Sequence, residues 1–449
     1  MKVCKFGGSC LADAERLRHA CNIVMSDPER RLVVVSAPGE RYPDDTKVTD
    51  LLIAAAERVL EGRRPEKEMD EITGRFAAIQ EALGLPDSIV KQIRDDLNDR
   101  LSADTSHRER YLDGVKARGE DYCARLVTEQ LRAMGADGKY MDPCTAGLRL
   151  SDEYGNARLL PESYENLSRW RDSSGITVFP GFYGCTPQGE VVTFPRGGSD
   201  ITGSILAAAV NAELYENFTD VDSVFAADPA IVPEAGPIEE LTYREMRELS
   251  YAGFGVLHDE AIVPAVRAGV PICVKNVKHP DSAGTTILPE HLGKYSRVAG
   301  IAAASGFCTV FSSKYLMNRE IGFGRHLLQI FEEEGLSYEH APSGIDSMSV
   351  LLCERGFDGE TERTVRERIE KELGADAVEV ERGLALIMIV GEGMRHTVGL
   401  AAKAAGAMAK AGVNIEMMNQ GSSEISMMFG VRAADREKAV RSLYEAFFS

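Results

Sequence analysis

Short apolar runs alternate with amphipathic segments over roughly the first 280 residues. The runs at 32–35 and 176–179 consist of residues typical of buried strands and end in small-residue turns. Between such runs, apolar side chains recur at helical spacing, for example at Leu17, Ala20, Cys21 and Val24. Apolar strands that alternate with helices predict an α/β domain with a largely parallel sheet.

The last third of the chain contains an internal repeat. A shift of 77 residues superposes Met317 on Met394, Gly322 on Gly399, Gly335 on Gly412, Glu339 on Glu416, Gly344 on Gly421 and Ser349 on Ser426. Each copy predicts the order strand, helix, strand, strand. Because one such unit cannot bury both faces of its sheet, we expect the copies to pair edge to edge or across a dimer.

Longer helical segments interrupt this pattern. Residues 65–101 are charged and helical with a break at Gly84, and we interpret them as a helical insertion with solvated faces. Further helices are expected from Val48, at 111–134 and at 241–258.

Two Gly-Gly-Ser turns each follow a predicted strand and a basic residue. The first is Lys5-Phe6-Gly7-Gly8-Ser9 and the second is Arg196-Gly197-Gly198-Ser199-Asp200. Glycine lets the backbone approach a phosphate closely, and the N-terminus of a helix offers free N–H donors. We expect Ser9 to cap the helix that follows it. The two turns together predict two anion sites that face one cleft.

Composition limits the partners. A formal net charge of −19 argues against nucleic acid and against an anionic membrane surface, so anionic substrates must meet locally placed cations. No apolar run reaches the roughly 20 residues that cross a bilayer, and we expect a soluble cytoplasmic protein. The nine cysteines are scattered and form no metal-ligand pattern, so we expect them to be reduced and mostly packed.

These motifs, together with Phe218-Thr219-Asp220-Val221-Asp222 and Ala227-Asp228-Pro229, resemble those of aspartate kinases in the amino acid kinase superfamily. The resemblance implies a three-layer α/β/α sandwich with a largely parallel sheet, followed by two ferredoxin-like βαββ ACT domains. It implies a catalytic domain at 1–295 with the helical insertion near 65–110, a first ACT domain at 296–380 and a second at 381–449. The strand at 298–312 is expected to complete the second ACT domain.

The reaction that the resemblance implies is the ATP-dependent phosphorylation of L-aspartate on its side-chain carboxylate, the first step towards lysine, threonine and methionine. ATP, with Mg²⁺ on the nucleotide, would be the phosphoryl donor. The implied catalytic residues are Lys5 and Asp200. The implied substrate-binding residues are Ser36, Thr49, Glu120, Arg196, Gly197, Gly198 and Ser199. The implied ATP-binding residues are Lys5, Gly7, Gly8, Ser9, Thr219, Asp220, Phe225, Asp228, Gly255 and Val256.

The repeat resembles tandem ACT domains, which implies a homodimer and an inhibitory amino acid effector. The expected effector residues are Met317, Gly322, Phe323 and Glu339. Gly322 would free backbone N–H groups for an α-carboxylate, and the Glu339 carboxylate favours lysine as the effector over threonine.

Three positions depart from the family pattern. The family often has a tyrosine, an arginine and a lysine where this chain has Phe225, Ala230 and Gly255. The loss of two cations predicts either weak ATP binding or a substitute such as Lys275. Two alternatives stay open: a catalytically weak amino acid sensor, or a kinase for glutamate or N-acetylglutamate. Glu120 disfavours an acylated amine, because such a substrate carries no ammonium for a carboxylate to bind.

Overall fold

The computed structural model describes residues 1–195, 197–255, 257, 260–293, 296–421, 423 and 425–449. It contains two compact units. The first comprises residues 1–224, 237–247 and 255–293, and the second comprises 225–236, 248–254 and 294–449. The domain boundaries expected near residues 295 and 380 stay predictions. No helix in the described part of the chain is long and apolar enough to cross a membrane.

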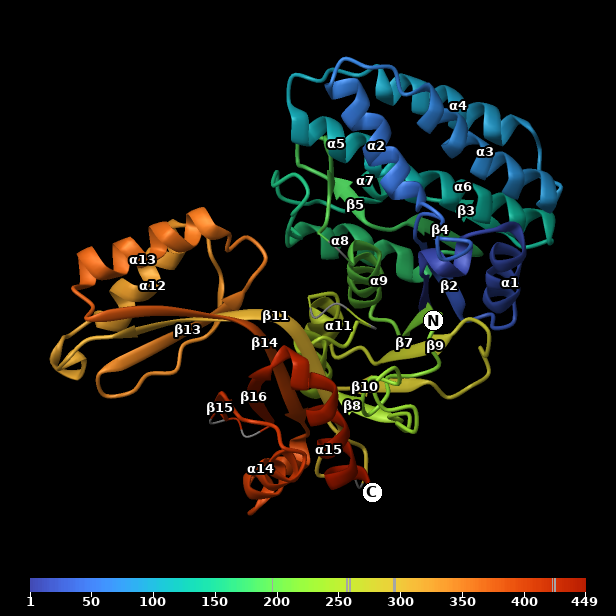
Figure 1. Cartoon of the computed structure of the whole chain (residues 1–449). Coiled ribbons are helices and arrows are strands. Elements are labelled where there is room, and N and C mark those ends of the chain that lie inside the picture. Colours follow the sequence, from blue (N-terminus) through green and yellow to red (C-terminus); the bar gives the residue numbers. More distant parts are fainter. Residues whose placement is uncertain (196, 256, 258–259, 294–295, 422, 424) are drawn as a thin grey trace. The chain divides into compact units, whose positions relative to one another are not determined.

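The first unit is built on a sheet in which the described residues form eight strands, in the order β3-β4-β2-β1-β7-β9-β10-β8 (Figure 1). Every neighbouring pair in this described sheet is parallel except β9 and β10. The predicted, largely parallel sheet is therefore confirmed. Its strands are β1 (Lys2–Phe6), β2 (Arg30–Val35), β3 (Gly138–Tyr140), β4 (Ile176–Pro180), β7 (Leu214–Thr219), β8 (Glu240–Thr242), β9 (Ile272–Asn276) and β10 (Thr285–Leu288).

Helices cover both faces of this sheet (Figure 1). One face carries α1 (Ala14–Met25) and α6 (Arg118–Ala133), with four helices packed outside them: α2 (Val48–Leu60), α3 (Glu66–Leu83), α4 (Ser88–Leu101) and α5 (Arg108–Lys116). The other face carries α8 (Glu162–Ser168), α9 (Gly198–Ala209) and α11 (Val263–Ala268). The predicted three layers are thus present, and a short hairpin of β5 (Tyr183–Cys185) and β6 (Val191–Thr193) lies outside the main sheet.

The sequence pattern predicted most of these helices, but the structure corrects three of the expectations. All four apolar positions expected on α1 are buried. Ser9 does not cap this helix, however, because Gly8–Leu11 forms a short 3-10 turn (η1) and the side chain of Asp13 accepts the N–H of Arg16 instead. The helix expected at 111–134 is two helices that meet at Ala117. Of the helix expected at 241–258, the described residues form only α10 (Tyr243–Tyr251), and residues 256 and 258 lie outside them.

The second unit contains one sheet, which its described residues form from six strands in the order β12-β13-β11-β14-β16-β15. The strands are β11 (Gly300–Ser313), β12 (Tyr338–His340), β13 (Ser347–Cys353), β14 (Ala377–Val390), β15 (Met417–Asn419) and β16 (Ser426–Arg432). The long strands β11 and β14 pair antiparallel along almost their whole length, so the two copies share one sheet. The helices are α12 (Phe323–Glu333), α13 (Gly359–Leu373), α14 (Leu400–Lys410) and α15 (Arg436–Phe448).

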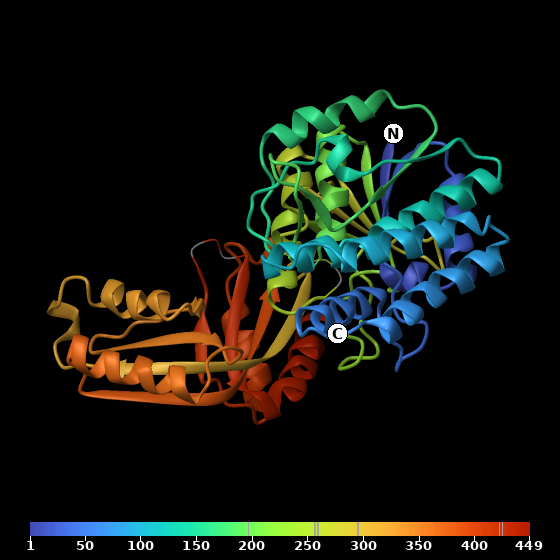
Figure 2. The ribbon, with the colours of Figure 1, turned by 90° about the horizontal axis from the view of Figure 1, so that it is seen from above.

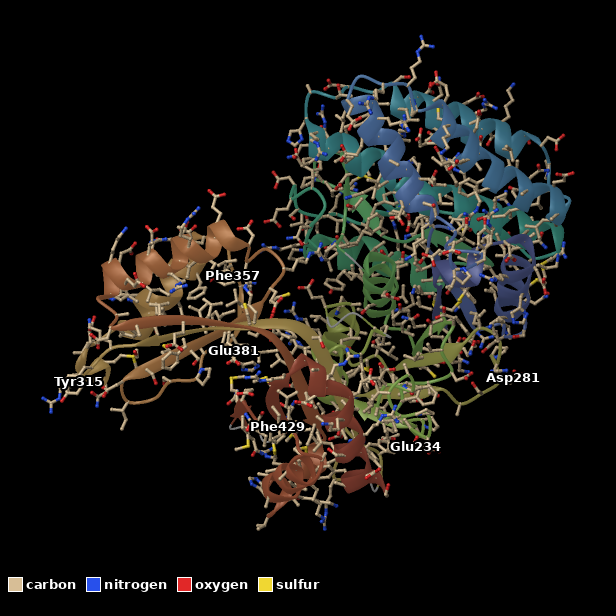
Figure 3. The ribbon with its side chains drawn as sticks, in the orientation of Figure 1. Glu234, Asp281, Tyr315, Phe357, Glu381 and Phe429 are labelled. Atoms are coloured by element: carbon tan, nitrogen blue, oxygen red, sulfur yellow. A yellow bond between two sulfur atoms is a disulfide. The ribbon has the colours of Figure 1, made fainter. Side chains whose placement is uncertain are left out.

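The repeat is visible in the backbone. Gly322 and Gly399 both have positive φ and precede α12 and α14, and Gly335 and Gly412 both have positive φ just after those helices. Helices α12 and α13 run side by side over one face of the sheet (Figures 1 and 2). Phe357 and Phe429, labelled in Figure 3, are buried in the second unit.

The expectation of reduced cysteines is wrong for one pair. Cys144, on the short helix α7 (Pro143–Ala146), and Cys185, on β5, form a disulfide. Their Cα atoms are 5.2 Å apart although 41 positions separate them in sequence, so only the fold reveals the pairing. The other described cysteines are unpaired, and except for Cys353 they are buried as expected.

Candidate active site

Strand alternation directs Lys5 to one face of the sheet. Cys4 and Phe6 belong to the hydrophobic cluster under α1–α6, so the side chain of Lys5 between them points to the face that carries α9. There Lys5 is only 7% exposed, and its Nζ lies 2.5 Å from Oδ1 of Asp200 in the first turn of α9. The structure thus brings together the two residues predicted to be catalytic, although one lies near the start of the chain and the other on α9.

The Gly7-Gly8 turn lies directly against the loop that follows β2. The N–H of Gly39 donates to the carbonyl of Gly8 at 2.9 Å, and a Cβ on Gly8 would lie 2.7 Å from the carbonyl oxygen of Ala37. Only glycine permits this approach of two backbones. The N–H of Gly7 donates to the carbonyl of Phe218, so the amides available to an anion at this turn belong to Gly8 and Ser9.

The second Gly-Gly-Ser turn forms the start of α9. Gly197 has a φ of 82° and occupies the N-cap position, and Gly198 and Ser199 begin the first turn. Their N–H groups have no carbonyl one turn back, which leaves them directed at the mouth of the site. A Cβ on Gly198 would lie 2.6 Å from the ring of Phe182. Arg196, the basic residue of this motif, lies outside the described residues.

Glu120 is a buried carboxylate on α6. It is 5% exposed, and no hydrogen-bond donor among the described residues reaches its Oε2. Burial raises the pKa of this carboxyl to about 8, against a backbone hydrogen bond from Ala37 that lowers it. A buried acceptor without a partner is unfavourable in isolation, so its position suits a cationic ligand group.

These groups line one cavity of about 750 Å³ in the first unit. Of the residues singled out from the sequence, the lining includes Gly8, Ser9, Ser36, Thr49, Glu120, Gly197, Gly198, Ser199, Asp200 and Asp220. Lys5 reaches it through its contact with Asp200. Among the described residues, no group of three or more His, Cys, Asp or Glu side chains could hold a metal ion.

The other residues predicted to bind ATP lie elsewhere in the chain. Thr219 ends β7 beside Asp220, to which its hydroxyl donates at 3.2 Å. Phe225 and Asp228 belong to a segment of the second unit. Gly255 belongs to the first unit, and Val256 lies outside the described residues.

Lys275, suggested as a substitute cation, is already engaged within the sheet. Its Nζ lies 3.6 Å from Oε1 of the buried Glu216 and donates to the carbonyl of Pro280 at 3.3 Å. Glu216 also holds Arg30, with a distance of 2.6 Å between Nε and Oε2. Lys275 therefore belongs to a structural ion-pair group, and its role as a substitute cation stays a prediction.

Several residues in or near the cavity were not identified from the sequence. Asn217 on β7 is buried, donates from Nδ2 to Oδ1 of Asp200 at 2.8 Å, and accepts from Nζ of Lys5 at 3.5 Å. In the sequence, the only feature that could have marked Asn217 as a site residue is its position two residues before Thr219. The cavity lining also includes the cations Arg16, Arg41 and Lys47, which no motif singled out.

The predicted effector residues lie in the second unit. Met317 and Phe323 are buried in the hydrophobic cluster of the first repeat, so their side chains face the core. Gly322, with a φ of 87°, precedes α12. Glu339 is on β12, and its Oε2 accepts a hydrogen bond from the hydroxyl of Tyr251. Burial raises the pKa of the Glu339 carboxyl.

Comparison with known proteins gives the site a context. The model of the amino acid kinase family matches residues 1–276, and the model of the ACT domain matches residues 387–447. Aspartokinase 3 of Bacillus subtilis (strain 168) is 55% identical over 449 residues, which cover 100% of this chain and 99% of the relative.

Solved structures agree with this result. The crystal structure of Clostridium acetobutylicum aspartate kinase has a TM-score of 0.88 and 37% sequence identity, with 100% of both chains covered. Escherichia coli aspartokinase III is similar in two states at 27% identity and 100% coverage of both chains. Its complex with aspartate and ADP (R-state) has a TM-score of 0.83, and its complex with lysine and aspartate (T-state) has a TM-score of 0.80.

Proposed function

The chain belongs to the aspartate kinases of the amino acid kinase family, and from that premise we infer that it transfers the γ-phosphoryl group of ATP to the side-chain carboxylate of L-aspartate. The product is 4-phospho-L-aspartate. The observation in the structure that supports this most directly is the cavity lined by Asp200, which holds Lys5, and by Glu120, whose buried Oε2 has no hydrogen-bond donor among the described residues.

The reaction needs no general base. An aspartate side chain has a pKa near ~4 and is already ionised at neutral pH. The difficulty is that an anion attacks a polyanion, so catalysis depends on in-line positioning and on cancellation of charge. Lys5 supplies that positive charge, and Asp200 holds its ammonium in place at 2.5 Å. The N–H groups of Gly8 and Ser9 donate to the phosphates.

The α-substituents of aspartate fix its orientation. Glu120 neutralises the α-ammonium, which gives its buried Oε2 a charged partner. Arg196 provides a planar fork for the α-carboxylate, and the N–H groups of Gly198 and Ser199 assist it. Ser36 and Thr49, which line the same cavity, complete the substrate contacts. A substrate with an acylated amine would leave Glu120 buried without a cation.

The nucleotide brings its own metal ion. Mg²⁺ bound to ATP would be held mainly by the phosphates, with help from Asp200 and Asp220 of the cavity lining, because the described residues provide no protein cage for a metal. Bound there, Mg²⁺ neutralises phosphate charge. Thr219, Gly7, Gly255 and Val256 border the nucleotide in this proposal, whereas nucleotide contacts of Phe225 and Asp228 stay predictions.

Regulation is proposed at the second unit. An amino acid effector binds near Gly322 and Glu339 and inhibits the enzyme, with lysine favoured over threonine. The support is the ACT match and the lysine complex of the E. coli relative, together with the half-buried Glu339 carboxylate. We further propose a homodimer formed through the repeat, a cytoplasmic location and a role in lysine, threonine and methionine biosynthesis.

One experiment separates this function from its alternatives. The protein is incubated with ATP, Mg²⁺ and L-aspartate, and hydroxylamine traps any acyl phosphate as the hydroxamate. Calorimetric titrations with ATP and with aspartate accompany the assay. Product with aspartate but not with glutamate or N-acetylglutamate supports the proposal, whereas amino acid binding without any hydroxamate identifies a sensor.

A further inference from the structure

The loop between β2 and α2 forms one wall of the active-site cavity. Residues 36–43 and Lys47 line it continuously, and no helix or strand is formed between the end of β2 and the start of α2. A wall without secondary structure has no hydrogen-bond ladder of its own. Other parts of the first unit must therefore hold it in place.

Arg75 of α3 provides the most extensive of these contacts. Its Nη2 donates to the carbonyl of Gly39 at 2.6 Å, and its Nη1 donates to the carbonyl of Thr46 at 3.0 Å. The same Nη1 lies 3.0 Å from Oδ2 of Asp45. Arg75 is 6% exposed, so these contacts are shielded from water.

The Asp45 carboxylate forms contacts within the loop. It accepts the backbone N–H of Arg41 at 3.0 Å, and its oxygens lie within 2.8 Å of the Arg41 guanidinium nitrogens Nε and Nη2. Arg41 and Arg75 hold the pKa of this carboxyl well below its usual range. Asp45 is therefore ionised at neutral pH, and Arg75 is its buried counter-ion.

A second arginine also holds this loop. Arg16 of α1 donates from Nη1 to the carbonyls of Ser9 and Glu40 and from Nη2 to that of Arg41, at 3.1 to 3.2 Å. Two guanidinium groups from two helices thus bind the carbonyls at both ends of the loop segment. The partial negative charge of these carbonyl oxygens is thereby paired with cations.

The contact with Gly39 reaches the phosphate turn. The carbonyl of Gly39 accepts from Arg75, and the N–H of Gly39 donates to the carbonyl of Gly8 at 2.9 Å. A Cβ at Gly39 would lie 2.7 Å from the carbonyl carbon of Gly8, so the two backbones are in direct contact. A shift of Gly39 therefore displaces the Gly7-Gly8 turn or opens a gap behind it.

We propose that Arg75 is a positioning residue for phosphoryl transfer, through which the helical insertion fixes loop 39–46 against the Gly7-Gly8 turn. The catalytic consequence rests on the proposed function, whereas the fixation of the loop does not. The proposal gives a role to helix α3, whose charged surface otherwise resembles a solvated addition to the domain.

The test compares Arg75→Met and Arg75→Lys with Arg94→Met in the full-length protein. Arg94 is a matched control, because it joins α4 to α3 through an exposed ion pair with Asp70 at 3.3 Å and does not contact the loop. Hydrogen exchange of the amides of residues 39–47 reports on fixation without any need for activity. Steady-state kinetics report on positioning, and thermal unfolding shows that each variant is folded.

In Arg75→Met we expect exchange in the loop to be about tenfold faster or more, and kcat/KM for aspartate to fall by about 10- to 100-fold. Arg75→Lys should be intermediate, because the single nitrogen of an ammonium lacks the planar fork with which Nη1 and Nη2 of Arg75 reach separate oxygens. Arg94→Met should stay within about twofold of wild type in both measurements.

Unchanged loop exchange in folded Arg75→Met, or in Arg75→Lys if the methionine variant does not fold, overturns the fixation. Faster exchange with unchanged kinetic constants overturns the positioning role. A wild-type protein that makes no acyl phosphate overturns the proposed function instead, and the exchange measurement still decides whether Arg75 holds the loop.

Discussion

Lys5 is the residue whose charge matters most in the transition state. Replacement by alanine should lower turnover by about a hundredfold or more, because one preorganised charge at the transferring group is removed. The KM for aspartate should change by no more than about a few fold, since the α-groups of aspartate bind elsewhere in the cavity. Steady-state kinetics of Lys5→Ala measure both values. Turnover equal to wild type would remove Lys5 from the catalytic role.

Glu120 makes aspartate binding dependent on pH. Burial raises the pKa of its carboxyl to about 8 from an ordinary value of 4.5, so between these values the folded, ligand-free protein holds a proton that the unfolded chain has lost. The contribution of Glu120 to stability therefore falls as the pH rises through this interval. Because aspartate needs the ionised form, its binding should release this proton.

The corresponding measurement is calorimetric titration with aspartate from pH 6 to 8. Affinity should rise by up to about tenfold per pH unit and level off near pH 8. Glu120→Gln should bind weakly and lose this dependence. A wild-type affinity that is flat across the range would show that the carboxyl is already ionised without ligand.

Asn217 extends the catalytic pair to a third side chain. It bridges Asp200 and Lys5 from the neighbouring strand β7, so Asn217→Leu leaves both charges present but removes the amide between them. We expect turnover to fall by about tenfold, with smaller changes in the KM values, because the loss is one of orientation. Asn217→Ser, which restores a hydroxyl donor, should recover part of the turnover. If KM and kcat changed by similar factors, and did so in both Asn217→Leu and Asn217→Ser, the cause would be a general packing defect instead.

At the scale of elements, the start of α9 depends on a close approach to the end of β4. A Cβ at Gly181 would lie 2.6 Å from Oγ and 2.8 Å from Cα of Ser199, so Gly181→Ala must displace the first turn of α9. The overpacking should cost about 1 to 3 kcal/mol and raise the KM for aspartate. Gly114→Ala, on α5 with open space around it, is the matched control and should leave both stability and KM unimpaired. Thermal unfolding and kinetics test the pair, and identical behaviour of the two variants would contradict this packing argument.

At the scale of the whole molecule, regulation requires a ligand that prefers one arrangement of the enzyme. Lysine can inhibit only by binding the inactive arrangement more tightly, and aspartate must then weaken lysine binding by the same factor. The last residue of α10, Tyr251, donates from its hydroxyl to Glu339 within the second unit. An effector ammonium at Glu339 would compete with this hydrogen bond.

We therefore expect lysine to bind at millimolar concentration and Glu339→Ala to abolish the binding. Titrations with and without aspartate measure the coupling factor. Tyr251→Phe, which removes only the competing hydroxyl, should retain lysine binding and change the coupling. If threonine binds and lysine does not, the effector is threonine. If neither binds, the repeat serves only in dimer formation.

The sequence by itself determined the fold class and the family. The largely parallel α/β sheet and the repeat follow from the spacing of apolar positions and glycines, whereas the three layers and the predicted site residues follow from the resemblance of short motifs. Ser9 shows the limit even there, because a nearby aspartate competes for the cap and the sequence offers both.

Only the tertiary structure decided which distant residues meet. Lys5 and Asp200 lie 195 positions apart and come together because β1 faces α9. The Cys144–Cys185 disulfide, the Asn217 bridge and the Arg75 contact with Gly39 have the same origin. Such contacts are set by how elements pack in space, and no local spacing records them. Burial, too, is a property of the packed fold, so the raised pKa of Glu120 could not be foreseen from its neighbours in the chain.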